Sequence, residues 1–199
     1  MNGRCAGDAS PFVERWTRDV HGGTALDVAC GLGRHVRLLL SRGVAVVGVD
    51  RDPAALDAIA NESADAVANG RLELVLADLE NAPWPLGDRQ FALVVVTNYL
   101  WRPLLPRVLS AVALDGLLLY ETFRAGQERF GRPSNPDFLL QPGELRSVVG
   151  DAFEVLQFED GPEGDPPTAM RQRIAARRKK DATLQWRGAD AMGRLRASE

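Results

Sequence analysis

The chain has 199 residues, of which 45% are hydrophobic and 26% are charged, the balance of an ordinary soluble globular protein. This length suits one domain with its own core, which we expect over residues 1–180. The apolar runs are shorter than the roughly 20 residues of a membrane span, and the first ten residues do not look like a signal peptide. The two cysteines and two histidines lack metal-ligand spacing, so we expect no metal site and a cytoplasmic setting.

The net charge of −3 is unevenly distributed along the chain. Residues 171–199 hold nine Arg or Lys and three Asp or Glu, a surplus of six positive charges, which leaves −9 on residues 1–170. The basic block consists of Arg171, Arg173, Arg177, Arg178, Lys179 and Lys180. Aromatic side chains that would stack on bases do not interleave these charges. We therefore expect the solvent face of a last strand, followed by a flexible basic tail over 181–199, and no nucleic-acid partner.

The first expected helix runs from Pro11 to about Val20, because Ser10 is a good N-cap and proline suits the first helical position. Phe12 and Trp16 lie on its apolar face at helical spacing. These two aromatic side chains either pack into the core or form a flap over a ligand.

A strand, a glycine-containing turn and a helix follow one another directly after this helix. Residues 25–29 form the apolar strand, and Val36 opens a helical pattern that ends at Gly43. Gly31 and Gly33 allow positive φ in the turn and let a ligand lie on the main chain. The first amides of a helix are unpaired and the helix dipole adds to them, so this turn predicts the binding of a small anionic group.

The rest of the chain alternates between strand and helix patterns. Apolar runs predict strands at 44–50, 72–77, 91–96 and 117–123, and helical spacing predicts helices at 53–68, 104–113 and 142–150. This order predicts an α/β fold with a Rossmann-like, doubly wound, mostly parallel sheet. Two alternating segments at 153–159 and 169–176 predict a C-terminal antiparallel hairpin. Residues 124–141 lack periodicity, and a loop of this length is usually functional or disordered.

The second strand closes at Asp50, seventeen residues after Gly33, where an acidic residue typically accepts hydrogen bonds from a ribose diol. A dinucleotide fingerprint would have a third glycine where this chain has Val36. The segment Asp27–His35 instead resembles the first motif of class I S-adenosylmethionine-dependent methyltransferases, and the compact chain is similar to small single-domain bacterial members such as the tellurite-resistance type. Ala29 departs from the glycine that many members carry at this position.

The resemblance implies S-adenosyl-L-methionine as cofactor, S-adenosyl-L-homocysteine as product and no metal. In the family the glycine turn holds the methionine end, the acid after the second strand holds the ribose, and the acid after the third receives the adenine amino group. Asp78 is the acid after the third strand. The alternative to a role in adenine binding is that it only caps a turn at the surface. The implied cofactor-binding residues are Asp27, Ala29, Gly31, Gly33, Arg34, Asp50, Arg51, Asp78, Leu79, Thr97 and Asn98.

In-line methyl transfer depends on alignment, and the sulfonium needs a partner such as an aromatic face. Tyr99, after the fourth strand, is the candidate for that role. Glu121 and Tyr120, at the end of the fifth strand, are the candidate catalytic bases, and Glu121 could otherwise cap a loop. His35, on the helix after the glycine turn, is expected to be a packing residue. A soft anionic acceptor would require positive charge in place of a base. The candidate acceptor-binding residues are Arg102, Arg124, Arg132 and Asn135.

We therefore expect a methyltransferase that acts on a small molecule such as a thiol, an oxyanion or a metabolite. An RNA methyltransferase would explain the basic block, although the Asn-Pro-Pro-aromatic signature that the family uses for base nitrogens is absent. A catalytically silent S-adenosylmethionine-binding protein would also fit these residues, and an NAD-linked oxidoreductase would share the fold. The residues leave the acceptor and the oligomeric state open.

Overall fold

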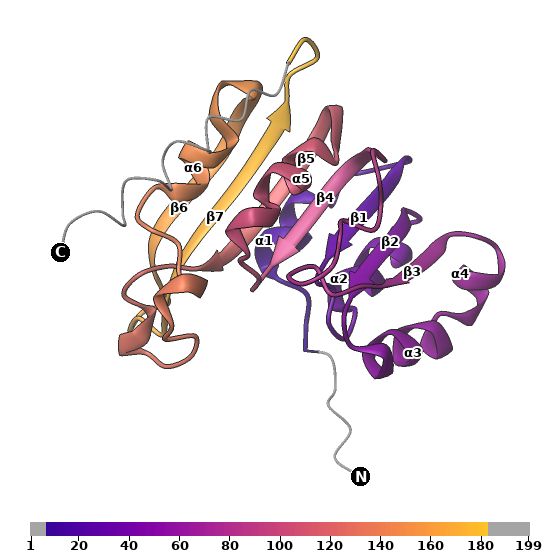
Figure 1. Ribbon diagram of the computed structural model, residues 1–199, viewed down its shortest axis with the longest axis horizontal. Helices are drawn as coiled ribbons and strands as arrows, with labels where there is room; N and C mark the ends of the chain where they lie inside the picture. The colour runs from indigo at the N-terminus through magenta and orange to yellow at the C-terminus, as the bar shows by residue number, and fades with distance from the viewer. Residues whose placement is uncertain (1–6, 183–199) are drawn as a thin grey trace.

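The strands form one sheet in the order β3-β2-β1-β4-β5-β7-β6 (Figure 1), in a computed structural model that describes residues 7–182. The first five strands run parallel, whereas β7 is antiparallel to both of its neighbours. The strands are β1 (Thr24–Val28), β2 (Ala45–Asp50), β3 (Leu72–Leu76), β4 (Phe91–Thr97), β5 (Val112–Phe123), β6 (Phe153–Glu163) and β7 (Ala169–Arg178). The predicted fold class, including the C-terminal antiparallel hairpin, is thus confirmed.

The helices cover the two faces of this sheet and create two apolar layers (Figure 1). The helices are α1 (Pro11–Trp16), α2 (Arg34–Ser41), α3 (Pro53–Glu62), α4 (Ala64–Ala68), α5 (Leu105–Ser110) and α6 (Glu144–Val149). Apolar side chains of α1 to α4 pack on one face, and those of α5 and α6 pack on the other. Strand β4 contributes alternately to both layers, as expected of a central strand: Leu93 and Val95 to one, Val94 and Val96 to the other.

Three elements differ from the sequence prediction. Helix α1 ends at Trp16, because the backbone of its C-cap Thr17 leaves the helical conformation, with a φ of −103° and a ψ of 5°. The Thr17 hydroxyl donates to the Val13 carbonyl at this end of the helix. The predicted helix over 53–68 is interrupted at Ser63, whose φ of −121° separates α3 from α4. Strand β5 begins at Val112 and not at residue 117 as predicted, and its register with β4 shifts in this first part of the strand.

Residues 124–141 contain two short 3₁₀ turns, Gln127–Arg129 and Pro136–Phe138, in place of an irregular loop. An isolated bridge between Arg124 and Leu140 joins the two ends of this segment. Of the predicted basic tail, residues 183–199 lie outside the described range. Within the range from residue 7 to residue 182, no helix has both the length and the apolar character needed to cross a membrane.

Candidate functional site

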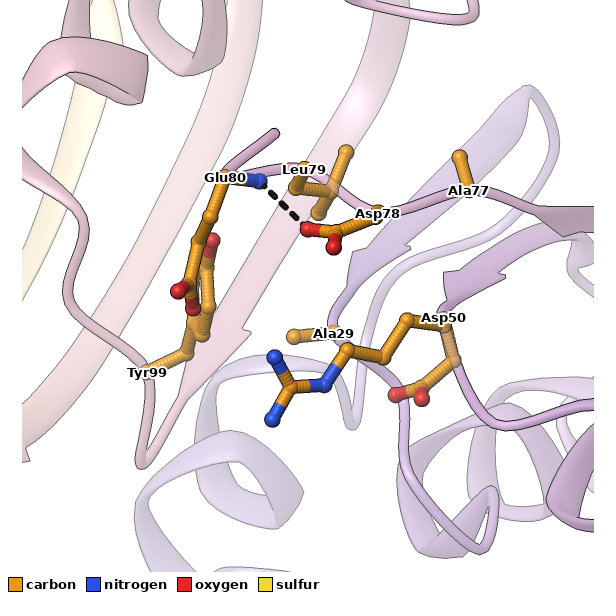
Figure 2. Close-up of a pocket in the computed structure, with 8 residues that line it drawn as sticks. Ala29, Asp50, Ala77, Asp78, Leu79, Glu80 and Tyr99 are labelled. Atoms are coloured by element: carbon orange, nitrogen blue, oxygen red, sulfur yellow. Dashed lines mark hydrogen bonds between the residues drawn. The ribbon is translucent and has the colours of Figure 1, made fainter. Parts of the chain in front are cut away.

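A cavity of about 210 Å³ opens where the parallel strands β1 to β4 end (Figure 2). Such edges are where open α/β sheets bind their ligands. Figure 2 shows Tyr99 and Glu80 together on one side of the cavity, with Asp50 on the other side and Ala29 between them. The cavity is lined by Ala29, Asp50, Arg51, Ala77, Asp78, Leu79, Glu80 and Tyr99.

The glycine turn after β1 has its residues in the left-handed region, with φ values of 53° at Gly31 and 75° at Gly33. A Cβ on Gly33 would lie 2.7 Å from Ile59 of α3, so this glycine lets the two helices approach each other. A Cβ on Gly31 would meet nothing within 4 Å among residues 7–182. Gly33 therefore serves the packing, whereas Gly31 leaves the main chain open to a ligand.

Ala29, at the departure from the family motif, has a φ of 53°. This left-handed conformation is one that alanine rarely adopts, because its Cβ approaches the following carbonyl oxygen. The same residue lines the cavity. The sequence departure thus places local backbone strain directly at the predicted site.

Asp27 is 1% exposed, and its Oδ2 has no hydrogen-bond partner in the part of the chain that the structure describes. Burial raises the pKa of this carboxyl group to about 7, against the opposing effect of the Arg34 guanidinium, while Asp50 adds a smaller increase. A buried carboxylate oxygen without a partner is costly to keep. A cationic group of a ligand would remove that cost.

Asp50 and Asp78 follow β2 and β3, and each holds a backbone turn. The Asp50 Oδ2 accepts a hydrogen bond from the Gly31 N–H at 2.7 Å, and its Oδ1 accepts one from Asp52 at 2.9 Å. The Asp78 carboxylate accepts the N–H of Glu80 at 3.0 Å and the side-chain amide of Asn81 at 2.9 Å. The Asn81 amide lowers the pKa of Asp78. Asp78 therefore caps a turn, and it also lines the cavity.

Tyr99 is half-buried, and its hydroxyl lacks a hydrogen-bond partner within the described residues. Burial, followed by the nearby Glu80 and Asp78 carboxylates, raises the pKa of Tyr99 above its usual range. Tyr120 lies beneath it, 2% exposed, and its hydroxyl donates to the Tyr99 carbonyl at 2.9 Å. Tyr99 therefore lines the cavity as a neutral side chain, and Tyr120 holds its backbone.

Thr97 is the last residue of β4, and Asn98 follows it. His35, 1% exposed, accepts the Ser10 N–H at its Nε2 at 3.1 Å, and its Nδ1 lies 3.3 Å from the Thr97 hydroxyl. The Arg34 guanidinium lies 3.5 Å from the same hydroxyl oxygen. Burial, with a smaller effect of Arg34, lowers the pKa of His35 to about 3, so its ring is neutral. His35 is a buried packing residue, in line with the sequence prediction.

Glu121 is 4% exposed and forms a 2.6 Å ion pair with Arg173 of β7. Arg173 also pairs with Glu159 and Glu163 of β6. Arg171 pairs with Glu163 at 2.6 Å and donates to the Asn98 Oδ1 at 2.7 Å. The part of the basic block that reaches the site edge is thus neutralised by acidic side chains.

The candidate acceptor-binding residues fall into two groups. Arg102 binds Glu144 through two hydrogen bonds of 2.8 and 2.9 Å and also donates to the carbonyls of Asp137 and Leu139, and Arg124 pairs with Asp160 at 2.7 Å. Both arginines therefore fasten the 124–141 segment and α6 to the sheet. Exposed positions belong instead to Arg132 and to Asn135, which caps the second 3₁₀ turn.

Sequence reasoning missed Glu80 and Ala77, which flank the predicted Asp78 and Leu79 along the same wall of the cavity. Their positions in the sequence could have identified them, because both residues belong to the segment that follows β3. It also missed the Arg171–Asn98 contact, which joins residues 73 positions apart and left no local pattern. Across residues 7–182 no group of three His, Cys, Asp or Glu side chains is arranged to hold a metal ion.

Comparisons with known proteins agree with this geometry. Residues 25–114 match the methyltransferase domain family. The ribosomal RNA small subunit methyltransferase H of Gemmatimonas aurantiaca is 42% identical over 160 residues, which are 79% of this chain and 47% of that protein. The chain thus spans about half the length of this curated relative.

Solved structures share the fold. TehB from Haemophilus influenzae has a TM-score of 0.67 and 18% identity over 84% of this chain and 61% of its own. An S-adenosylmethionine-dependent methyltransferase from Mesorhizobium loti has a TM-score of 0.66 and 18% identity over 84% and 96% of the two chains. Together with the matched domain, these similarities confirm the resemblance that was inferred from the Asp27–His35 segment.

Proposed function

We propose that this chain, which has the class I methyltransferase fold and a methyltransferase domain, binds S-adenosylmethionine and methylates a small-molecule acceptor. The observation that carries the proposal is the buried Asp27 oxygen without a partner among residues 7–182, directly below the glycine turn. A carboxylate in that position fits the ammonium group of the cofactor's amino-acid end, which would supply the missing charged hydrogen bond.

We assign the other cofactor contacts to residues that line the cavity. Asp50 would accept hydrogen bonds from the ribose, and Asp78 with the Leu79 amide would bind the adenine. Ala29 and Arg51 border the same space, because they follow the strands β1 and β2 directly. When bound, S-adenosylmethionine supplies an electrophilic methyl group on a sulfonium.

The residues around the methyl position would bind the sulfonium of the cofactor and orient it toward the acceptor. The Tyr99 ring and its neutral hydroxyl would contact the cationic sulfonium and help to exclude water. The Tyr120 hydroxyl donates to the Tyr99 carbonyl at 2.9 Å and thereby fixes the backbone from which the ring projects. Alignment of the two reacting groups would then supply much of the rate.

We infer the class of acceptor from whether the candidate bases are free to take up a proton. Glu121 is held by Arg173 at 2.6 Å, so taking up a proton would break a buried ion pair. Tyr120 is buried and donates its proton to a carbonyl, and both nitrogens of His35 are engaged. We therefore assign Glu121 a positioning role and infer an acceptor that arrives as a nucleophile, such as a thiolate or an oxyanion. Arg132 and Asn135 are the candidates to contact it from the 124–141 segment.

The test combines cofactor titration with an acceptor screen. Isothermal titration should show binding of S-adenosylmethionine, and Asp50→Ala should weaken it by about tenfold or more, because charge-assisted hydrogen bonds contribute roughly 1.5–3 kcal/mol each. Transfer of radiolabelled methyl should then be measured over thiols, oxyanions, metabolites and bulk RNA. Unchanged affinity in Asp50→Ala would place the ribose elsewhere, and a protein that binds cofactor without methylating any acceptor would be a binding protein only.

RNA is the second candidate acceptor, because the curated relative carries the name of an RNA methyltransferase. The ion pairs of Arg171 and Arg173 oppose it, since cations that are already paired release few counterions when they meet phosphates. Submicromolar RNA binding that weakens steeply with salt would favour RNA over a small molecule.

A further inference from the structure

The imidazole of His35 has a fixed tautomer. A backbone N–H can only donate, so the Nε2 that accepts the Ser10 N–H at 3.1 Å must carry a lone pair. The ring is neutral, and its proton therefore resides on Nδ1, 3.3 Å from the Thr97 hydroxyl oxygen. His35 is thus the donor of this second hydrogen bond, and Thr97 is the acceptor.

This assignment decides what the Thr97 hydroxyl can still do. Its oxygen receives the His35 N–H and faces the Arg34 guanidinium at 3.5 Å, so its own hydrogen must point away from both. Within the described residues that hydrogen has no acceptor, although the side chain is only 9% exposed. Thr97 is the last residue of β4, at the ligand-binding edge of the sheet. Its hydroxyl is therefore a donor without an acceptor among residues 7–182.

The surroundings of Thr97 favour an anion. Arg34 is the first residue of the eight-residue helix α2, whose N-terminal amides add to its positive charge. Asp27, the residue suited to an ammonium group, is close enough to Arg34 for the guanidinium to affect its pKa. A cation site and an anion site side by side match the two charged groups of an α-amino acid.

We propose that His35 is a positioning residue that holds the Thr97 hydroxyl as a hydrogen-bond donor to the α-carboxylate of S-adenosylmethionine. This inference rests on the proposed function. His35 has a second, separable duty through Nε2, since the Ser10 backbone that it binds is the N-cap of α1. One nitrogen thus serves the cofactor site and the other fixes the N-terminal helix.

Two substitutions separate these duties, because the amide of asparagine imitates Nδ1 and that of glutamine imitates Nε2. His35→Gln keeps an acceptor for Ser10 but removes the donor to Thr97, so it should weaken cofactor binding about five- to tenfold with little loss of stability. His35→Asn should restore cofactor affinity and lower the unfolding midpoint. His21→Gln, at the exposed histidine, is the matched control.

Thr97→Val tests the hydroxyl itself by isothermal titration. It should weaken S-adenosylmethionine and S-adenosylhomocysteine about five- to tenfold, leave decarboxylated S-adenosylmethionine unchanged, and add nothing to His35→Gln in a double-mutant cycle. Thr97→Ser should restore binding. Equal weakening of the decarboxylated ligand, additive effects, or unchanged affinity in Thr97→Val would each overturn the inference.

The tautomer can be measured without any ligand. The chain has two histidines, so long-range ¹H–¹⁵N correlations on the free protein are readily assigned, and they should show His35 protonated at Nδ1. Protonation at Nε2 would overturn the inference whatever the protein binds. A wild-type protein that is protonated at Nδ1 but does not bind S-adenosylmethionine would instead overturn the proposed function, and with it the role of Thr97.

Discussion

The two halves of the sheet differ in the partners of the charged side chains that surround the proposed site. In the half that we propose to bind the cofactor (the cofactor half), formed by β3, β2, β1 and β4, the carboxylates of Asp50 and Asp78 contact backbone amides, and Asp27 keeps an oxygen without a partner among the described residues. In the half that we propose to contact the acceptor (the acceptor half), formed by β5, β7, β6, residues 124–141 and α6, Glu121 and Glu144 contact arginines. The cofactor half is left incomplete, whereas the acceptor half is closed by its own ion pairs.

This difference predicts which substitutions lower the affinity for the cofactor and which lower the stability of the fold. A buried polar group that lacks a partner costs stability until a ligand supplies one, so the cofactor half should lose affinity more readily than stability. An ion pair that joins a loop to a sheet contributes to the fold itself, so the acceptor half should lose stability first. Substitutions in the two halves can therefore break or sharpen the comparison.

The largest effect is expected from Asp27→Asn. Loss of the charged partner of the cofactor's ammonium should weaken binding about 100-fold, or about 2.7 kcal/mol. The free protein should not lose stability at pH 8, because the substitution removes a buried charge. Isothermal titration and urea unfolding measure the two quantities. Loss of both stability and affinity in this variant would show that Asp27 is a structural residue, and the contrast between the two halves of the sheet would then not hold.

Arg102→Ala should show the reverse pattern. The substitution leaves the Glu144 carboxylate and the carbonyls of Asp137 and Leu139 without their donor. We expect a loss of about 2 kcal/mol in unfolding free energy, while cofactor affinity stays within about twofold of the wild type. Arg132→Ala, at an exposed position of the same segment, is the control and should stay within about 0.5 kcal/mol.

The same contrast explains which features the sequence predicted. The positions of the strands and of Asp50 and Asp78 at their ends followed from apolar runs, because such patterns are local. The partners of Glu121 and Arg102 did not follow, since Arg173 and Glu144 are 52 and 42 residues away along the chain. The sequence showed that these side chains are charged, but only the folded chain shows that their charges are already paired.

The dependence of folding stability on pH should distinguish Asp27 from His35, because their contributions change with pH in opposite directions. The folded pKa of Asp27 is raised from 3.8 to about 7, so its contribution to stability is lost as pH rises through that window. The folded pKa of His35 is lowered from 6.5 to about 3, so stability is lost as pH falls from 6.5 towards 3. Arg34 acts on both groups, and Asp50 acts on Asp27.

Between pH 4.5 and 6.5 these two contributions should largely cancel in the wild type. Asp27→Asn should therefore gain stability with rising pH and His35→Gln should lose it, each by about 1 kcal/mol per pH unit. Urea unfolding at several pH values gives the slopes. Parallel slopes in the two variants would show that neither group titrates as its burial requires.

The smallest effect concerns the glycine turn, where Ala29 and Gly31 share a φ of 53°. Ala29→Gly should relieve left-handed strain of about 1 kcal/mol, of which the added freedom of the unfolded chain takes back roughly half, so the net gain should be about 0.5 kcal/mol. Gly31→Ala is the matched opposite: it should cost about 1 kcal/mol and also weaken cofactor binding, since its methyl group would extend into space that is free of atoms within 4 Å across residues 7–182. Thermal unfolding and cofactor titration of the two variants measure these effects. A loss of stability in Ala29→Gly would mean that the alanine methyl group makes contacts worth more than the strain, and that the departure from the family motif is a packing choice.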